Sequence, residues 1–127
     1  LLAVDRTNAL VADMFDGFHP AVLRALEITS KAGIHAKIPV ALCGEMAGDP
    51  LAAVLLVGLG VNELSMSSAA LAQVKRALGA FSSAECQSLA TQALMQESGV
   101  QVLRIVAQEF VDKDLSLLVP PNLRESL

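Results

Sequence analysis

Apolar residues recur at helical spacing in four stretches of the chain and form short, unbroken runs in others. The helical spacing predicts helices over about residues 20–33, 69–78, 83–95 and 99–111, and a longer apolar stretch predicts a helix over residues 51–59. The runs at 38–43 and 61–66 are typical of strands. We expect the strand at 38–43 to be buried on both faces, and the helix at 51–59 to be covered on more than one side.

Capping residues predict where several helices begin and end. His19 precedes a proline and marks a helix start, because proline is well tolerated at the first helical position. Asp49 is placed to cap the apolar helix, and Ser82 with Glu85 has the spacing of a capping box. Gly33 is expected to end the first helix.

The order of these elements is helix, strand, helix, strand, helix. Such alternation is typical of β/α units around a parallel sheet, with residues 1–4 as the end of another extended segment. The predicted fold class is therefore α/β. The helices at 83–95 and 99–111 are expected to dock beside the sheet, with Leu89, Ala93, Val102, Val106 and Phe110 facing inward. Residues 114–127 lack a period and are expected to run over the surface or fray.

The composition indicates that part of the apolar surface of the chain is buried against another protein segment. Hydrophobic residues make up 54% and charged residues 17%, with a mean hydropathy of +0.55, so little polar surface is available. A parallel sheet of only two or three strands does not form a stable domain. We therefore expect either an oligomer or a piece of a larger domain, and the opening residues, which lack an initiator Met, favour the piece.

Charge and cysteine usage exclude several classes of protein. The net charge is −4 and no Lys/Arg cluster is present, which argues against nucleic-acid binding. The longest apolar stretch is about half the ~20 residues that span a bilayer, so no membrane span is predicted. Cys43 and Cys86 are far apart and lack metal-ligand spacing, so we expect a reducing, cytoplasmic location rather than a disulfide scaffold or zinc site.

Two side chains follow predicted strand ends, where α/β folds place their chemistry. Cys43 ends the strand at 38–43, although a free cysteine is often only a small core residue. Glu45 could orient the thiol or take a structural hydrogen bond in the loop. A carboxylate close to the thiol would keep it protonated, and hence an acid rather than a nucleophile. Arg6 could bind a carboxylate or phosphate, or simply pair with a neighbouring acid. We interpret His19 as a helix-start residue and His35 as a solvated loop residue rather than as bases.

The chain resembles the phosphoenolpyruvate-utilising enzymes, in the form found in enzyme I of the phosphotransferase system. The most specific match is the run LCGEMAGDP at residues 42–50, which contains the Cys-Gly-Glu signature. Further matches follow in the family's order and spacing: residues 2–6 with Asn8, residues 19–23, residues 58–60 and residues 63–67. Residues 1–6 and 19–50 are most similar to the nitrogen-related branch of enzyme I.

The resemblance implies that the chain is the C-terminal part of a phosphoenolpyruvate-binding (β/α)8 TIM barrel. Residues 1–79 would be its last β/α units, and residues 80–127 the C-terminal helices and tail of the same domain. Members of the family bind phosphoenolpyruvate and magnesium. They transfer the phosphoryl group to a histidine and then to a histidine phosphocarrier protein, and they release pyruvate. Its metal ligands, further substrate arginines and the phosphorylated histidine match positions before Leu1, so we expect no metal ligand in this chain. The resemblance also implies a homodimer.

The same resemblance assigns roles to three residues. Cys43 matches the proton donor, Arg6 matches an arginine that binds the substrate, and Glu45 belongs to the signature in a supporting role. The chemistry is consistent, because loss of the phosphoryl group leaves an enolate whose carbon a neutral thiol can protonate. We expect the 127 residues alone to be inactive.

Two alternatives stay open at this point. A non-catalytic oligomerisation or regulatory module would also explain the apolar composition, with Cys43 and Arg6 as scaffold. A phosphoenolpyruvate synthase or pyruvate phosphate dikinase relative would share the signature, although residues 46–50 favour enzyme I.

Overall fold

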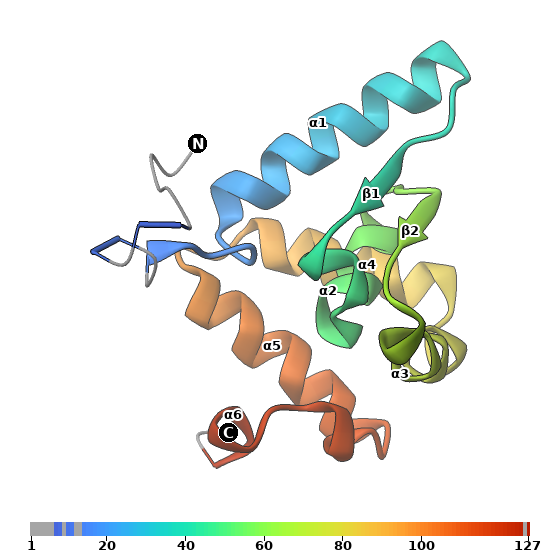
Figure 1. Cartoon of the computed structure of the whole chain (residues 1–127). Helices are drawn as coiled ribbons and strands as arrows, with labels where there is room; N and C mark the ends of the chain where they lie inside the picture. The colour runs from blue at the N-terminus through green and yellow to red at the C-terminus, as the bar shows by residue number, and fades with distance from the viewer. Residues whose placement is uncertain (1–6, 9, 12–13, 126) are drawn as a thin grey trace.

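The computed structural model describes residues 7–8, 10–11, 14–125 and 127 and confirms the predicted order of elements (Figure 1). The predicted strand-end stub at residues 1–4 lies outside the described residues. The elements are α1 Pro20–Ala36, β1 Ala41–Cys43, the short 3-10 helix η2 Glu45–Gly48, α2 Pro50–Gly58, β2 Glu63–Ser65, α3 Ser68–Gly79, α4 Ser83–Leu94, α5 Gly99–Asp112, the 3-10 helix η3 Ser116–Leu118, and α6 Pro121–Arg124.

The two strands pair in parallel, as the β/α alternation predicts. Ala41, Leu42 and Cys43 lie opposite Glu63, Leu64 and Ser65. Side chains alternate between the two faces of a strand, so Leu42 and Leu64 share one face and are half-buried. Cys43 and Ser65 share the other face and are exposed. The expectation of a strand buried on both faces is therefore wrong, because no described element covers this second face.

Helix α2 forms the centre of the molecule. All six residues of 51–56 are buried, as predicted for a helix covered on more than one side. It packs chiefly against α4 and also against α3. In Figure 1, α2 and α4 lie behind the strands and α3 lies below β2. The Asp49 side chain accepts hydrogen bonds from the backbone N–H groups of Leu51 and Ala52, confirming the predicted cap.

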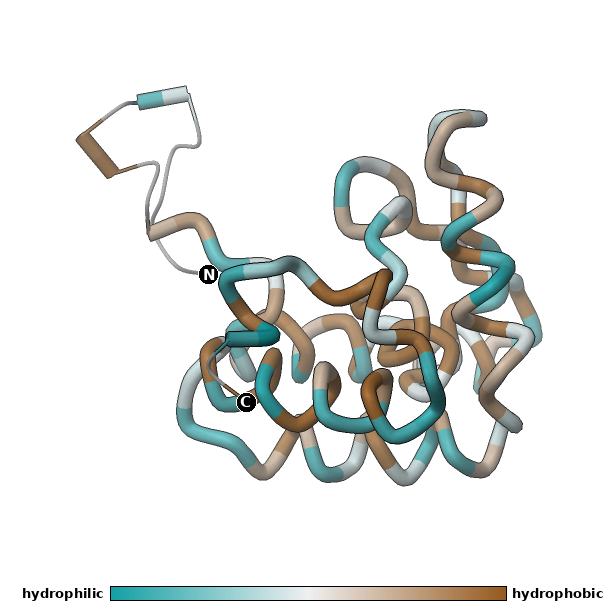
Figure 2. The backbone as a smooth tube through the Cα atoms, turned by 90° about the horizontal axis from the view of Figure 1, so that it is seen from below, coloured by the Kyte–Doolittle hydropathy of each residue, from teal (hydrophilic) through white to brown (hydrophobic). Residues whose placement is uncertain are grey.

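The C-terminal helices complete the core on the far side of α2. Every predicted inward residue of α4 and α5 is buried: Leu89, Ala93, Val102, Val106 and Phe110. Figure 2 shows apolar and polar positions alternating along these helical segments. The chain after residue 114 departs from the prediction of an unpacked tail. It forms η3 and α6, and the side chains of Leu115 and Val119 pack into the same core, which a search for helical periods misses in so short a segment.

The end of α1 also differs from the prediction. Gly33 is buried inside the helix, where a Cβ would overlap the Val40 side chain, so its role is close packing rather than termination. The helix ends at Ala36, and Lys37 adopts a left-handed conformation (φ 57°). The N–H of Ile38 then donates to the carbonyl of Gly33, as in a Schellman ending. His35 thus lies in the last helical turn, exposed, and not in a loop.

Large apolar side chains remain exposed on several elements. They include Ile28 and Ile34 on α1, Ile38 between α1 and β1, and Leu71 on α3, each between 48% and 68% exposed. Within the described part of the chain, no helix is long and apolar enough to cross a membrane.

Candidate functional site

The sequence-predicted residue Cys43 is the last residue of β1 and lies exposed at the carboxyl edge of the sheet. Gly44 follows with φ 94° and ψ −166°, a conformation that side-chain-bearing residues rarely adopt. This turn ends the strand directly after the thiol and starts η2. The edge position predicted for Cys43 is confirmed, and the prediction that it lies in a buried strand is not.

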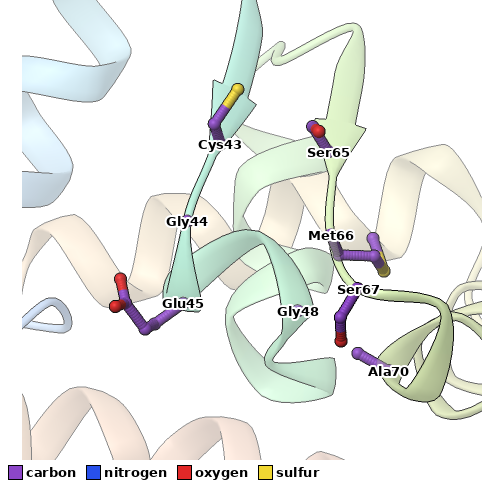
Figure 3. Close-up of a pocket in the computed structure, with 8 residues that line it drawn as sticks. All are labelled: Cys43, Gly44, Glu45, Gly48, Ser65, Met66, Ser67 and Ala70. Atoms are coloured by element: carbon purple, nitrogen blue, oxygen red, sulfur yellow. The ribbon is translucent and has the colours of Figure 1, made fainter.

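A pocket of about 470 Å³ opens at this edge, between the ends of the two strands (Figure 3). It is lined by Cys43, Gly44, Glu45, Gly48, Ser65, Met66, Ser67 and Ala70. The lining therefore combines a thiol and two hydroxyls with a carboxylate at its border. The carboxyl ends of parallel strands are where α/β folds bind ligands, so the position agrees with a substrate site.

Close packing holds the two sides of the pocket together. A Cβ built at Gly48 would lie 3.3 Å from the Cβ of Ala70 and 3.6 Å from that of Met66. The end of η2 thus rests against the start of α3 and the residue that follows β2. Because Ser67 is the N-cap of α3, the pocket wall on this side is fixed by a helix start.

Glu45 and Arg6 do not join Cys43 at the pocket centre in the described structure. The Glu45 side chain is exposed and extends away from Cys43 and Ser65 in Figure 3. Arg6 lies outside the described residues. The supporting role of Glu45 and the substrate-binding role of Arg6 remain predictions.

The histidines have no place in this pocket. The Nδ1 atom of His19 accepts a hydrogen bond from the backbone N–H of Ala21 at 3.2 Å, which confirms its predicted role at the start of α1. His35 lies at the other end of the same helix. Among the described residues, no three His, Cys, Asp or Glu side chains gather as metal ligands would.

The two cysteines occupy opposite environments. Cys86 is 2% exposed within α4, where burial, and secondarily the negative charge of Glu85, raises the pKa of its thiol. Cys43 is open to solvent at the pocket. Of the two thiols, only that of Cys43 is placed to meet a substrate.

Sequence reasoning missed the hydroxyls of Ser65 and Ser67. The sequence places residues 61–66 in a predicted strand and residues 63–67 in the family resemblance, but neither pattern assigns a chemical role to Ser65 or Ser67. The signal lay in the register: two neighbouring parallel strands ending in Cys43 and Ser65 bring those residues to one edge.

Comparisons with known proteins show what the chain is similar to. Residues 1–82 match the family described as "PEP-utilising enzyme, PEP-binding domain". The chain is 44% identical over 108 residues to an Escherichia coli protein named "Phosphoenolpyruvate-dependent phosphotransferase system", covering 84% of this chain and 14% of that protein. It is 45% identical over 101 residues to the "Multiphosphoryl transfer protein" of Rhodobacter capsulatus, covering 80% of this chain and 12% of that protein.

A third relative comes from another organism. The "Phosphoenolpyruvate-protein phosphotransferase" of Mycoplasma pneumoniae is 36% identical over 113 residues, covering 89% of this chain and 20% of that protein. The chain thus spans between 12% and 20% of the length of these three relatives.

Proposed function

The chain belongs to the family of PEP-utilising enzymes, and we propose on that premise that the full-length protein is a phosphoenolpyruvate-protein phosphotransferase. It moves the phosphoryl group of phosphoenolpyruvate to a histidine and then to a histidine phosphocarrier protein, and releases pyruvate. The names of the relatives support this reaction. The observation that carries it for this chain is the exposed Cys43 at the carboxyl edge of β1, inside a pocket.

In this proposal the chain supplies the last β/α units of a (β/α)8 barrel. Two parallel strands in register, each followed by a helix, support that assignment. The exposed face bearing Cys43 and Ser65 then looks into the barrel, and the half-buried Leu42 and Leu64 look outward to the helices. The exposed apolar residues Ile34 and Ile38 suit contact with further parts of such a barrel.

The chemistry assigned to Cys43 is a single proton transfer. When the bond between phosphorus and the enol oxygen breaks, its electron pair stays on oxygen and leaves the enolate of pyruvate. The S–H bond of Cys43 then breaks, a C–H bond forms at the methylene carbon, and the electron pair of the S–H bond remains on sulfur. Arg6 holds anionic oxygen of the substrate, and Glu45 supports the loop that follows the strand.

The resemblance supports further parts of the proposal. Magnesium would assist the transfer, but the described residues offer no cluster of ligands for it, so no step here runs through the metal. The nitrogen-related branch rests on the similarity of residues 1–6 and 19–50. A homodimer and a cytoplasmic location belong to the same proposal.

The experiment that tests the function is phosphoryl transfer by the full-length protein. It is incubated with labelled phosphoenolpyruvate, magnesium and a histidine phosphocarrier, as wild type and as Cys43→Ala. We expect acid-labile label on the carrier and a rate of turnover lowered by about 10²-fold or more in the variant, the range of a lost general acid. Cys86→Ala, which removes the thiol outside the pocket, should keep turnover. Absence of transfer in the wild type would instead support a non-catalytic interaction module.

A further inference from the structure

Ser65 is the residue that the sheet places directly beside Cys43. The two are register partners at the carboxyl ends of β1 and β2. Partners on adjacent parallel strands are about 4.8 Å apart and point to the same face. Both side chains are exposed on that face, and both line the pocket. Figure 3 shows the two side chains at the ends of neighbouring strands, on either side of the gap between them.

Other polar groups near the pocket are less well placed to act on the thiol. The side chain of Glu45 extends away from Cys43 in Figure 3. Glu63 is on the same face as Ser65, but it lies two residues before it in β2 and is paired in register with Ala41. Ser67 lies beyond the end of β2, at the N-cap position of α3, and is not a register partner of Cys43. Asn62 is engaged elsewhere, since its Oδ1 accepts a hydrogen bond from the N–H of Val40 at 2.9 Å.

We propose that Ser65 is a positioning residue for Cys43, whose hydroxyl aims the thiol toward the pocket and stabilises the thiolate that forms when the proton is given away. This inference rests on the proposed function. Before the transfer, the Ser65 hydroxyl accepts a hydrogen bond from the Cys43 S–H group. After the transfer, rotation of the hydroxyl lets it donate to the thiolate sulfur, so that Ser65 neither gains nor loses a proton.

A hydroxyl suits this position for a physical reason. Cys43 and Ser65 line the same pocket on neighbouring strands, so rotation about χ1 changes the distance between the oxygen and the sulfur, and small side chains leave the pocket open for substrate. Charged neighbours would act differently: a carboxylate such as Glu63 disfavours the thiolate. Ser65 offers stabilisation of the thiolate without adding a charge.

The test measures thiolate formation directly, without the phosphotransfer reaction. The protein is treated with iodoacetamide, which forms an S–C bond with thiolate and releases iodide, and the alkylation of Cys43 and Cys86 is followed separately by peptide mass spectrometry. At pH 8 we expect Ser65→Ala to slow alkylation of Cys43 by roughly threefold to tenfold, and its pH profile to move upward. Ser65→Thr should retain the wild-type rate, because it keeps the hydroxyl on a strand-compatible side chain.

Two controls separate this role from a structural one. Ser68→Ala removes an exposed hydroxyl three residues away, outside the pocket, and should leave the alkylation of Cys43 unchanged. Cys86, buried in α4, reports any loosening of the fold through its own alkylation. Equal rates and pH profiles for Cys43 in the wild type and Ser65→Ala, or faster labelling of Cys86 in Ser65→Ala, would overturn the proposal.

A second readout separates this inference from the proposed function. In the full-length protein, Ser65→Ala should lower the rate of turnover with little change in the concentration of phosphoenolpyruvate that gives half-maximal rate. If Ser65→Ala slows alkylation while Cys43→Ala transfers phosphate normally, the proposed function of Cys43 fails, and the catalytic role of Ser65 fails with it. If Cys43→Ala is inactive but Ser65→Ala alkylates and turns over like the wild type, only the role of Ser65 is overturned.

Discussion

At the scale of single residues, the contact between α2 and α4 depends on Gly58. A Cβ at this position would overlap the backbone carbonyl of Cys86 and lie 2.8 Å from the Cβ of Ala90. Gly79 ends α3, and a Cβ there would meet nothing within 4 Å. The two positions therefore form a matched pair for substitution: Gly58 is closely packed, and Gly79 has open space around it.

We predict opposite effects for the two alanine substitutions. Gly58→Ala should lower the free energy of unfolding by more than about 1 kcal/mol, because the backbone of α4 must move away. Gly79→Ala should raise it by up to about 1 kcal/mol, since alanine favours the helix and restricts the unfolded chain. Urea denaturation followed by circular dichroism measures both. A neutral Gly58→Ala would contradict the described α2–α4 contact.

Phe110 offers a second prediction at the residue scale. Its side chain is fully buried, and its ring lies 5.3 Å from that of Phe81 at an angle of 39°. Phe110→Ala should cost about 3–5 kcal/mol of unfolding free energy through lost burial and a cavity. Leu117→Ala, at a side chain that is 76% exposed, should cost less than about 0.5 kcal/mol in the same measurement. Similar losses in the two variants would contradict the described core.

The residues of the candidate site were only partly predictable from sequence. Cys43 could be placed at a strand end because a short apolar run stops at Gly44. Ser65 could not be paired with it, because the register of two strands depends on the packing of the helices between them. The direction in which a side chain points is equally hard to predict. Glu45 lies two residues from Cys43 in the chain, yet its side chain extends away from Cys43.

At the scale of elements, the beginning of α4 is linked to the end of α5 through Glu85. The predicted capping box is confirmed: Ser82 Oγ accepts from the N–H of Glu85, and the Glu85 carboxylate accepts from the N–H of Ser82. Lys113, at the C-cap of α5, donates to Glu85 at 2.6 Å, and its Nζ atom lies 4.9 Å from the centre of the Phe81 ring. One carboxylate thus joins two helix ends.

This arrangement predicts a pH dependence of stability. The hydrogen bond from Lys113, followed by those from Ser82, lowers the pKa of Glu85 from 4.5 to about 2. Because the folded pKa is the lower one, the stabilisation is present above pH 4.5 and is lost as the pH falls towards 2. The stability difference between the wild type and Glu85→Gln should therefore shrink over this range.

The control for this prediction is a double-mutant cycle. Urea midpoints are compared for the wild type, Glu85→Gln, Lys113→Met and the double variant at pH 7 and at low pH. The cost of Glu85→Gln should be smaller in the Lys113→Met background at pH 7, because the principal partner has been removed. A cost that is independent of pH and of Lys113 would contradict the link.

Periodicity predicted which elements form but not how their faces are covered. The helix at residues 51–59 was assigned correctly, because an apolar surface all round must be buried whatever surrounds it. The strand at 38–43 was predicted to be buried on both faces by the same reasoning, yet Cys43 is exposed. A run of apolar residues indicates that a surface requires cover, and it does not say whether that cover lies within the same 127 residues.

At the scale of the whole molecule, the described chain has a closed side and an open side. Helices α2, α4 and α5 share one core, to which Leu115 and Val119 also contribute. The strands leave their second face exposed, together with the apolar side chains of Ile34 and Ile38. The pocket with Cys43 lies at the edge of this open side. The arrangement favours a site that is completed by residues beyond the two strands.

This arrangement predicts that the 127 residues alone do not catalyse the reaction. With labelled phosphoenolpyruvate, magnesium and a phosphocarrier, they should transfer no label above background, while the full-length protein does. The reason is that in the proposed mechanism Cys43 supplies only the proton, and the described residues contain no cluster of metal ligands. Transfer of label above background by the 127 residues would contradict this prediction.

The central claim is that Cys43 delivers the proton to the enolate. A thiol fixed at one edge of the pocket reaches one face of the planar enolate, whereas an enolate released to water is protonated on both faces. The most direct measurement uses phosphoenolpyruvate with deuterium and tritium placed stereospecifically at the methylene carbon, and determines the handedness of the methyl group in the pyruvate product. We predict a single handedness for the full-length wild type and a racemic methyl group for Cys43→Ala; a single handedness in both would contradict the claim.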